Sequence, residues 1–291
     1  MTLSRPQVAK LLAESQIRPS KALGQNFVVD PNTVRKIAHL AGLGPGDRVI
    51  EIGTGLGSLT LALMDTGADV VTVEKDSRLV SVARRVLAER GANVRIIEGD
   101  ALSLDWAELL RDAPTGEEPP WVLVANLPYN VATPLVVTLL ENVPQIARML
   151  VMVQREVGER MVARPGQPGY GAVSVKIAYW AKAKLAGKVP ASVFEPRPNV
   201  ESVLISIERI GGIVGGVSPS EYQSVREFVD AGFHTRRKML RNSLAGLVPG
   251  GVFDQAGIKP TARAEELGVE DWRRLVRLST GNTHPSSWVA R

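Results

Sequence analysis

The chain has 291 residues, of which 44% are hydrophobic and 22% charged, a composition typical of globular proteins that predicts about two domains at roughly 150 residues each. It contains no cysteine and only three histidines, which excludes disulfides, iron–sulfur clusters and thiolate zinc sites and predicts that the protein holds no metal. The N-terminus lacks the apolar core of a secretory signal, and asparagine and proline interrupt the longest uncharged run, residues 119–140. We therefore expect a cytoplasmic protein that does not cross a membrane.

Short apolar runs alternate with amphipathic stretches through the first half of the chain. The runs are 48–52, 69–73, 94–97, 121–125 and 149–153. Each pair is separated by enough residues for a crossover helix, so we predict βαβ units. An open, mostly parallel sheet with helices on both faces follows. Between the second and third runs, helical spacing begins behind Asp76, which we predict to be an N-cap.

The pattern changes after residue 208. A glycine-rich segment, 211–219, predicts a linker, and the apolar residues beyond it recur at helical spacing. We interpret Phe228, Phe233 and Trp272 as core residues of these helices. The predicted fold is α/β, with a Rossmann-like sheet in residues 1–208 and a small C-terminal α-helical domain in residues 209–291.

Positive charge is concentrated in two segments. The formal net charge is +5 and the isoelectric point is near 9.6, which favours a polyanionic partner. Residues 152–188 carry seven Lys or Arg against two acids, and residues 234–241 carry four cations and no acid. One such cluster fits a solvated face as well as a binding surface, but two in one chain favour RNA or DNA.

A glycine-rich turn follows the first apolar run. Gly53 and Gly55 let the backbone turn sharply and approach a ligand, but Ser58 stands where the dinucleotide fingerprint has its last glycine, so the pattern alone is weak. Glu74 ends the second run, where a carboxylate can accept both ribose hydroxyls, and Asp100 follows the third, where it can accept the amine of an adenine. No arginine or lysine nest faces a phosphate there, which favours S-adenosylmethionine over NAD.

Asn126, Leu127, Pro128 and Tyr129 follow the fourth run. A nucleobase amine is a poor nucleophile because its lone pair is delocalised into the ring. The Asn126 side-chain oxygen and the Leu127 carbonyl, held in a turn by Pro128, can both accept hydrogen bonds from one NH2 and leave its lone pair pointing at a sulfonium methyl. Tyr129 can stack on the base. Positioning and electrostatics then carry an in-line methyl transfer. The alternative interpretation of these four residues is a proline turn that only ends a strand. The glycine loop and the two upstream carboxylates, Glu74 and Asp100, favour the functional interpretation over it.

Taken in order, these segments resemble the rRNA adenine N6,N6-dimethyltransferases of the KsgA type, over residues 17–280. That family has a Rossmann-like methyltransferase domain that binds S-adenosylmethionine, with an N-terminal segment over the cofactor and a helical rRNA-binding domain. The matching motifs are Lys21–Phe27, Glu51–Gly57, Val73–Asp76, Glu98–Asp100, Asn126–Asn130, Gln154–Val157, Phe194–Ser202 and Phe233–Leu244.

The resemblance assigns roles to single residues. It implies that Asn26 and the backbone at Val28 close over the cofactor and that Phe194 is a second stacking wall opposite Tyr129. By its own pattern Phe194 reads as a core residue. The other cofactor residues that it implies are Gly53, Gly55, Glu74, Asp100 and Asn126. Thr54 departs from the family, which commonly has proline there, and this costs loop stiffness.

The resemblance also implies a reaction and a substrate. Enzymes of this type dimethylate two adjacent adenosines in the 3′-terminal hairpin of 16S rRNA, late in 30S assembly, and the target base must flip into the cleft. They act on the pre-30S particle, as monomers and without an obligate protein partner. The residues implied to contact rRNA phosphates are Arg155, Arg160, Arg236, Arg237, Lys238 and Arg241.

Three alternatives remain at this stage. The related 23S rRNA adenine methyltransferases that confer macrolide resistance share the catalytic motifs, but the motifs at 194–202 and 233–244 look like the small-subunit type. A non-catalytic assembly factor on the same fold is disfavoured by the intact Asn126 motif. A DNA adenine methyltransferase is disfavoured because nothing resembles a target-recognition domain.

Overall fold

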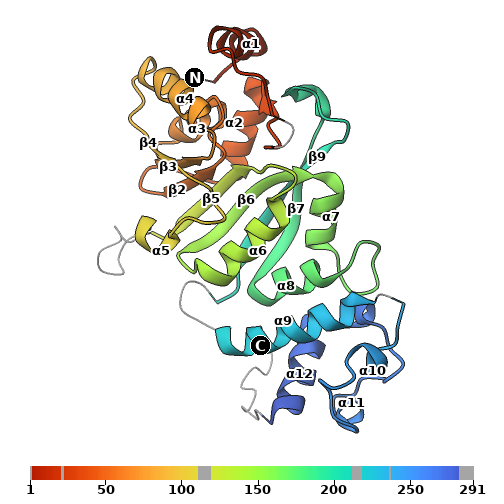
Figure 1. Ribbon diagram of the computed structural model, residues 1–291. Helices are drawn as coiled ribbons and strands as arrows, with labels where there is room; N and C mark the ends of the chain where they lie inside the picture. Colours follow the sequence, from red (N-terminus) through yellow and green to blue (C-terminus); the bar gives the residue numbers. More distant parts are fainter. Residues whose placement is uncertain (1, 21–22, 111–118, 212–217, 236, 282–291) are drawn as a thin grey trace. The chain divides into compact units, whose positions relative to one another are not determined.

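The computed structural model, shown as a ribbon in Figure 1, describes residues 2–20, 23–110, 119–211, 218–235 and 237–281. The chain forms two compact units. The first contains residues 1–159 and 182–214, and the second contains residues 160–181 and 215–291. Most of the predicted glycine-rich linker, residues 212–217, lies outside the described part of the chain.

A seven-stranded sheet organises the first unit, in the order β4-β3-β2-β5-β6-β9-β7. Strands β4, β3, β2, β5 and β6 pair in parallel, and β9 is antiparallel to β6. This confirms the predicted mostly parallel α/β sheet. The strands are β2 (Arg48–Ile52), β3 (Asp69–Glu74), β4 (Arg95–Glu98), β5 (Trp121–Asn126), β6 (Ile146–Gln154), β7 (Ala181–Val189) and β9 (Ser202–Arg209).

All five predicted strands form, but the sequence patterns do not predict β7 and β9. Strand β7 lies at the edge of the sheet and carries Lys182, Lys184 and Lys188, all exposed. Lysines are common on edge strands, where they discourage pairing with another chain. Such a strand lacks the continuous apolar run that marks a central strand.

Helices of the first unit bury apolar faces against the sheet. α2 and α3 share a core cluster with β2, β5 and β6, and the N-terminal segment shares a second cluster with α4. The Asp76 side chain accepts from the Arg78 N–H at the start of α4, which confirms the predicted N-cap. The helices are α1 (Arg5–Glu14), α2 (Pro31–Leu40), α3 (Ser58–Met64), α4 (Ser77–Ala88), α5 (Trp106–Leu109) and α6 (Ala132–Asn142); α7 (Arg155–Val162) runs into the second unit.

The second unit is helical. Phe228 and Trp272 are buried, which confirms their core interpretation, whereas Phe233 is partly buried and packs on the Trp272 ring with centroids 6.0 Å apart. The helices are α8 (Ala172–Trp180), α9 (Pro219–His234), α10 (Leu240–Ser243), α11 (Val252–Gln255) and α12 (Val269–Thr280). No helix in the described part of the chain is long and apolar enough to cross a membrane.

Residues 160–181 belong to the second unit, whereas the sequence prediction assigns them to the first domain. The reason is aromatic packing by α8. The rings of Tyr179 and Trp180 each lie 4.9 Å from the Tyr222 ring of α9, centroid to centroid. In sequence, α8 precedes the glycine-rich linker and therefore falls within the first predicted domain, so only the packing assigns it to this unit.

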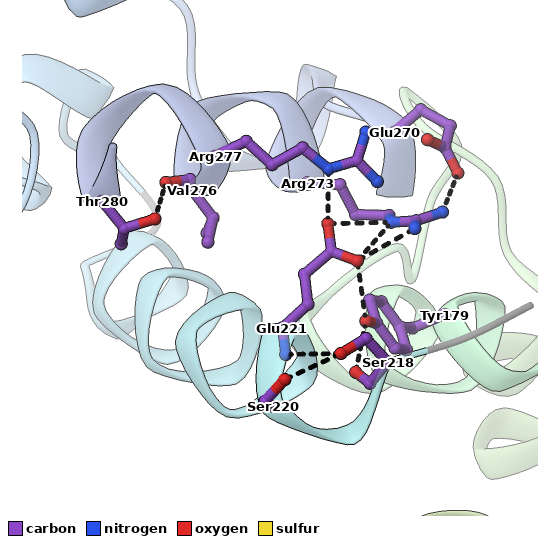
Figure 2. Close-up of polar contacts among 9 residues, drawn as sticks. All are labelled: Tyr179, Ser218, Ser220, Glu221, Glu270, Arg273, Val276, Arg277 and Thr280. Carbon is purple, nitrogen blue, oxygen red and sulfur yellow. Dashed lines mark hydrogen bonds and ion pairs between the residues drawn. The ribbon is translucent and has the colours of Figure 1, made fainter. Parts of the chain in front are cut away.

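A polar cluster around Glu221 joins α8, α9 and α12, as Figure 2 shows. One carboxylate oxygen accepts from Arg273 at 2.9 Å and the other from Arg277 at 2.7 Å. The Tyr179 hydroxyl donates to the Ser218 carbonyl at 2.9 Å and lies 3.2 Å from Glu221. Burial raises the pKa of Glu221, but the hydrogen bonds from both arginines outweigh it and lower the pKa overall.

Candidate active site

A cleft lies at the carboxyl ends of β2, β3, β4 and β5, and the N-terminal segment forms its other wall. Ligands in open α/β sheets bind outside the carboxyl ends of the strands. Every residue predicted to bind the cofactor lines this cleft. They are Asn26, Val28, Gly53, Gly55, Glu74, Asp100 and Asn126.

The glycine loop between β2 and α3 requires glycine for its backbone. Gly53 and Gly55 have φ values of +86° and +55°, in the left-handed region that other residues adopt at a cost. A Cβ at Gly55 would lie 3.1 Å from the Phe27 ring. The loop therefore presents bare backbone to the cleft, and any side chain at Gly55 would press on the covering segment.

The two strand-end carboxylates are held by backbone hydrogen bonds. Glu74 accepts from the Gly55 N–H and the Asp76 N–H, each at 2.9 Å, through different oxygens, and burial raises the pKa of its carboxyl group. Asp100 accepts from Lys75 at 2.7 Å and from the Leu102 N–H at 3.1 Å. The Lys75 hydrogen bond lowers the Asp100 pKa, so Asp100 is an ionised acceptor at the rim of the cleft.

Asn126 ends β5 with its side chain in a defined orientation. Its Nδ2 donates to the Asn26 carbonyl at 3.0 Å, and only the amide nitrogen can donate to a carbonyl. Its Oδ1 has no donor among the described residues and remains available as an acceptor at the cleft. Pro128 lines the cleft, while Leu127 is buried and its N–H donates to the Met152 carbonyl at 3.1 Å.

The two aromatic residues predicted to stack on the base are not among the cleft-lining residues. Tyr129 is half-buried, and its hydroxyl lies 3.1 Å from the Ser202 hydroxyl. Phe194 has no exposed surface and packs in the core cluster with Val28. The packing of Phe194 agrees with the core interpretation of its sequence pattern. A stacking role for either ring stays a prediction.

Hydrogen bonds tie the N-terminal segment to motifs far away in the sequence. Strand β1 (Phe27–Val28) pairs with β8 (Phe194–Glu195), and Gln25 Nε2 donates to Asp76 at 3.0 Å. Sequence reasoning assigns no role to Gln25, although it lies inside a quoted motif, because nothing in that motif indicates its distant partner. The start of that motif, residues 21–22, lies outside the described residues.

The cations predicted to bind RNA differ in their surroundings. Arg155 donates to Glu159 at 2.8 Å and lies 3.4 Å from Glu201, so its charge is largely compensated. Arg160 belongs to the second unit, and Arg236 lies outside the described residues. Within residues 234–241, the exposed cations that form no ion pair in the described chain are Arg237, Lys238 and Arg241.

Comparison with known proteins separates the remaining alternatives. A model of the ribosomal RNA adenine dimethylase family matches residues 17–280. The chain belongs to that family. This dimethylase is 45% identical over 285 residues to the ribosomal RNA small subunit methyltransferase A of Cutibacterium acnes, covering 94% of this chain and 93% of the relative. It is 42% identical over 282 residues to the protein of the same name from Thermobifida fusca, covering 94% of each.

Two solved structures share the fold of the dimethylase. A dimethyladenosine transferase from Plasmodium falciparum has a TM-score of 0.68 at 24% identity, covering 84% of this chain and 94% of that one. The 23S rRNA methyltransferase ErmE has a TM-score of 0.63 at 25% identity, covering 87% and 99%. The fold therefore occurs in a large-subunit enzyme as well, whereas the higher sequence identities are to small-subunit methyltransferases.

The cofactor of the dimethylase is S-adenosylmethionine, and the cleft fits it. Glu74 and Asp100 can hold the nucleoside, as predicted, and the apolar side chains of Leu79 and Leu102 line the same cleft. Ser58 also lines it, and its buried Oγ has no hydrogen-bond partner within the described chain.

Proposed function

We propose that the dimethylase transfers methyl groups from S-adenosylmethionine to the exocyclic amines of two adjacent adenosines in the 3′-terminal hairpin of 16S rRNA. The observation that carries this proposal is the free Oδ1 of Asn126 at a cleft that two strand-end carboxylates also line. We further propose that it acts in the cytoplasm, as a monomer, on the pre-30S particle late in assembly. The small-subunit methyltransferases to which it is 38–45% identical support this substrate.

The residues of the cleft suit methylation of an amine. Bound S-adenosylmethionine supplies an electrophilic methyl group on a sulfonium. Asn126 Oδ1 and the Leu127 carbonyl accept hydrogen bonds from the target amine, which favours a pyramidal nitrogen with its lone pair directed at that methyl group. Glu74 and Asp100 fix the cofactor's nucleoside, so the reacting atoms are held in line. No strong base is needed before attack, because the proton leaves from a cationic product.

Binding of the particle requires a second set of contacts. The target adenosine must leave its stack to enter the cleft, which costs free energy that other contacts must supply. Arg237, Lys238 and Arg241 are exposed cations with no ion pair in the described chain. Phosphate contacts of this kind give affinity and orientation without reading sequence.

A methylation assay tests the proposal. The purified protein and labelled S-adenosylmethionine are incubated separately with 30S and 50S subunits from a strain that lacks both methylations, and the labelled nucleotide is mapped. We expect dimethyladenosine in the 3′-terminal hairpin of the 30S subunit. Label only in the 50S subunit would favour the large-subunit reaction, and binding without label would favour a non-catalytic assembly factor.

Two variants connect the assay to the site. Asn126→Ala removes the amine acceptor and should lower kcat by about 10²-fold or more, since preorganised polar groups of this kind have effects of that size. Its cofactor affinity should change much less. Asn93→Ala, at an exposed position of the first unit, is the matched control. Full activity of Asn126→Ala would contradict the mechanism.

A further inference from the structure

The glycine loop between β2 and α3 loses much conformational entropy when it is ordered. Gly53, Gly55 and Gly57 all have positive φ values, and glycine loses more conformational freedom on ordering than any other residue. The backbone of this loop lines the cofactor cleft. If the loop moved freely, its backbone N–H groups and the neighbouring Glu74 would not be fixed in position for the cofactor. Cofactor binding therefore depends on the contacts that hold the loop.

Buried side chains hold the loop at both ends and in the middle. Thr60 on α3 donates to Glu51 on β2 at 2.6 Å, which joins the strand before the loop to the helix after it. Thr54, within the loop, lies 2.6 Å from the Thr72 hydroxyl on β3, oxygen to oxygen. The Gly55 N–H donates to Glu74 on the same strand. The four hydroxyl and carboxyl residues other than Glu74 are at most 3% exposed.

Glu51 is the unusual member of this set. It is completely buried and sits between Thr72 and Val124 in the strand registers. Its Oε2 accepts from Thr60, whereas its Oε1 has no hydrogen-bond partner within the described chain. Burial raises the pKa of Glu51 to about 8. The nearby negative charge of Glu74 adds to this rise, whereas the Thr60 and Thr72 hydroxyls act against it. The carboxyl group is therefore neutral at pH 7, as a buried acid without a cation should be.

We propose that Glu51, Thr54 and Thr72 are positioning residues for the cofactor, which hold the glycine loop through the Glu51–Thr60 and Thr54–Thr72 hydrogen bonds. None of the three needs to touch the methyl group or the target base. Their effect reaches the cofactor through the loop and through Glu74. The inference rests on the proposed function only in the identity of the cofactor.

Removing one hydroxyl tests the Thr54–Thr72 bond. Thr72→Val and Thr54→Val keep the shape of the side chain and break the Thr54–Thr72 hydrogen bond, so each should weaken S-adenosylmethionine binding about tenfold in calorimetry. kcat at saturating cofactor should not change. The double variant should bind no more weakly than the weaker single variant, because both lose the same bond. Thr72→Ser, which keeps the hydroxyl, should bind nearly as the wild type does.

The pH dependence of cofactor binding tests Glu51. If binding requires its neutral form, wild-type affinity should fall about fivefold between pH 8 and pH 9, because an ionised Glu51 faces the Glu74 charge. Glu51→Gln cannot ionise and should lack this decrease. The cofactor's amino group titrates near pH 8 in both proteins, so the difference between the two profiles isolates Glu51.

Each outcome decides between the possibilities. Wild-type affinity in both valine variants, or additive losses in the double variant, would overturn the role of the hydroxyl pair. Identical pH profiles for the wild type and Glu51→Gln would overturn the role of Glu51. Thermal unfolding of every variant shows whether it is folded, and the serine and glutamine variants remain informative if a valine variant is not. A wild-type protein that binds no S-adenosylmethionine would contradict the proposed function and this inference together, whereas normal methylation with unaffected variants would contradict only the inference.

Discussion

Gly232 on α9 leaves no room for a side chain. A Cβ built there would lie 2.4 Å from Cη2 and 3.2 Å from Cζ3 of Trp272, well inside ordinary contact distances. Trp272 is fully buried and packs against Phe233, so its ring has no free space to move into. We expect Gly232→Ala to destabilise the second unit by about 1–3 kcal/mol from overpacking. The better helix propensity of alanine opposes this by about 1 kcal/mol.

A second substitution separates the clash from other effects. Trp272→Phe removes Cη2 and Cζ3 of the indole, the atoms that the alanine methyl would meet. It loses no hydrogen bond, because the indole N–H has no partner within the described chain. Alone it should cost about 3 kcal/mol through the cavity that it leaves. In the double variant the methyl fills part of that cavity. We expect a favourable coupling free energy of about 1–2 kcal/mol.

Hydrogen exchange of the α12 amides measures these differences. It reports the opening of the second unit and does not depend on the fluorescence of Trp272, which one variant lacks. Urea unfolding of all four proteins gives an independent free energy. A stabilising Gly232→Ala, or two additive single effects, would refute the argument that contact with the Trp272 ring excludes a side chain at position 232.

The remaining predictions concern three carboxylates. Glu74→Gln cannot accept both backbone N–H groups through a carboxylate and should raise the Kd for S-adenosylmethionine at least tenfold in calorimetry; an unchanged Kd would remove Glu74 from the site. The Arg78 hydrogen bond lowers the pKa of Asp76 from 3.8 to about 2 against the effect of burial. The ionised form therefore stabilises the fold above about pH 4 and loses this effect as the pH falls toward 2. Asp76→Asn should cost about 2 kcal/mol in urea unfolding at pH 7 and almost nothing at pH 2; an equal cost at both would argue against ionisation as the cause. Glu221→Gln leaves Arg273 and Arg277 without their shared carboxylate and should destabilise the second unit by about 2 kcal/mol, whereas unchanged α9 amide exchange would show that the cluster contributes little.

Five strands of the sheet and the strand-end residues that line the cleft could be predicted from sequence because both follow from local patterns. Apolar runs at crossover spacing predict a mostly parallel sheet, and such a sheet brings the carboxyl ends of its strands to one edge. Glu74 and Asn126 directly follow a run and Asp100 lies three residues beyond one, so their convergence needs no knowledge of packing. The glycine loop follows from the same rule, because a tight strand-to-helix turn requires positive φ values.

Other features depend on contacts that no local pattern encodes. Tyr179 and Trp180 have the same spacing whether α8 covers a sheet or packs on α9, and only the aromatic contacts with Tyr222 decide it. The Thr54–Thr72 hydrogen bond joins residues that are unremarkable in their own segments. Phe194 is buried in the core cluster with Val28, as its own sequence pattern predicts, and the stacking role that the resemblance implies for it stays a prediction.

Pairing between distant motifs explains why the N-terminal segment matters for amine recognition. A side-chain amide carries one acceptor and one donor group, and a neighbouring hydrogen bond decides which of them faces a ligand. The Asn26 carbonyl accepts a hydrogen bond from Asn126 Nδ2, so Asn126 Oδ1 is left to accept from the target amine. If this segment were displaced, the Asn126 amide could turn and present its donor, which would repel the amine. Asn26, which lines the cleft and which we expect to close over the cofactor, thus supplies the carbonyl that orients Asn126. The same contact would then join the cover of the cofactor to the orientation of the amine acceptor.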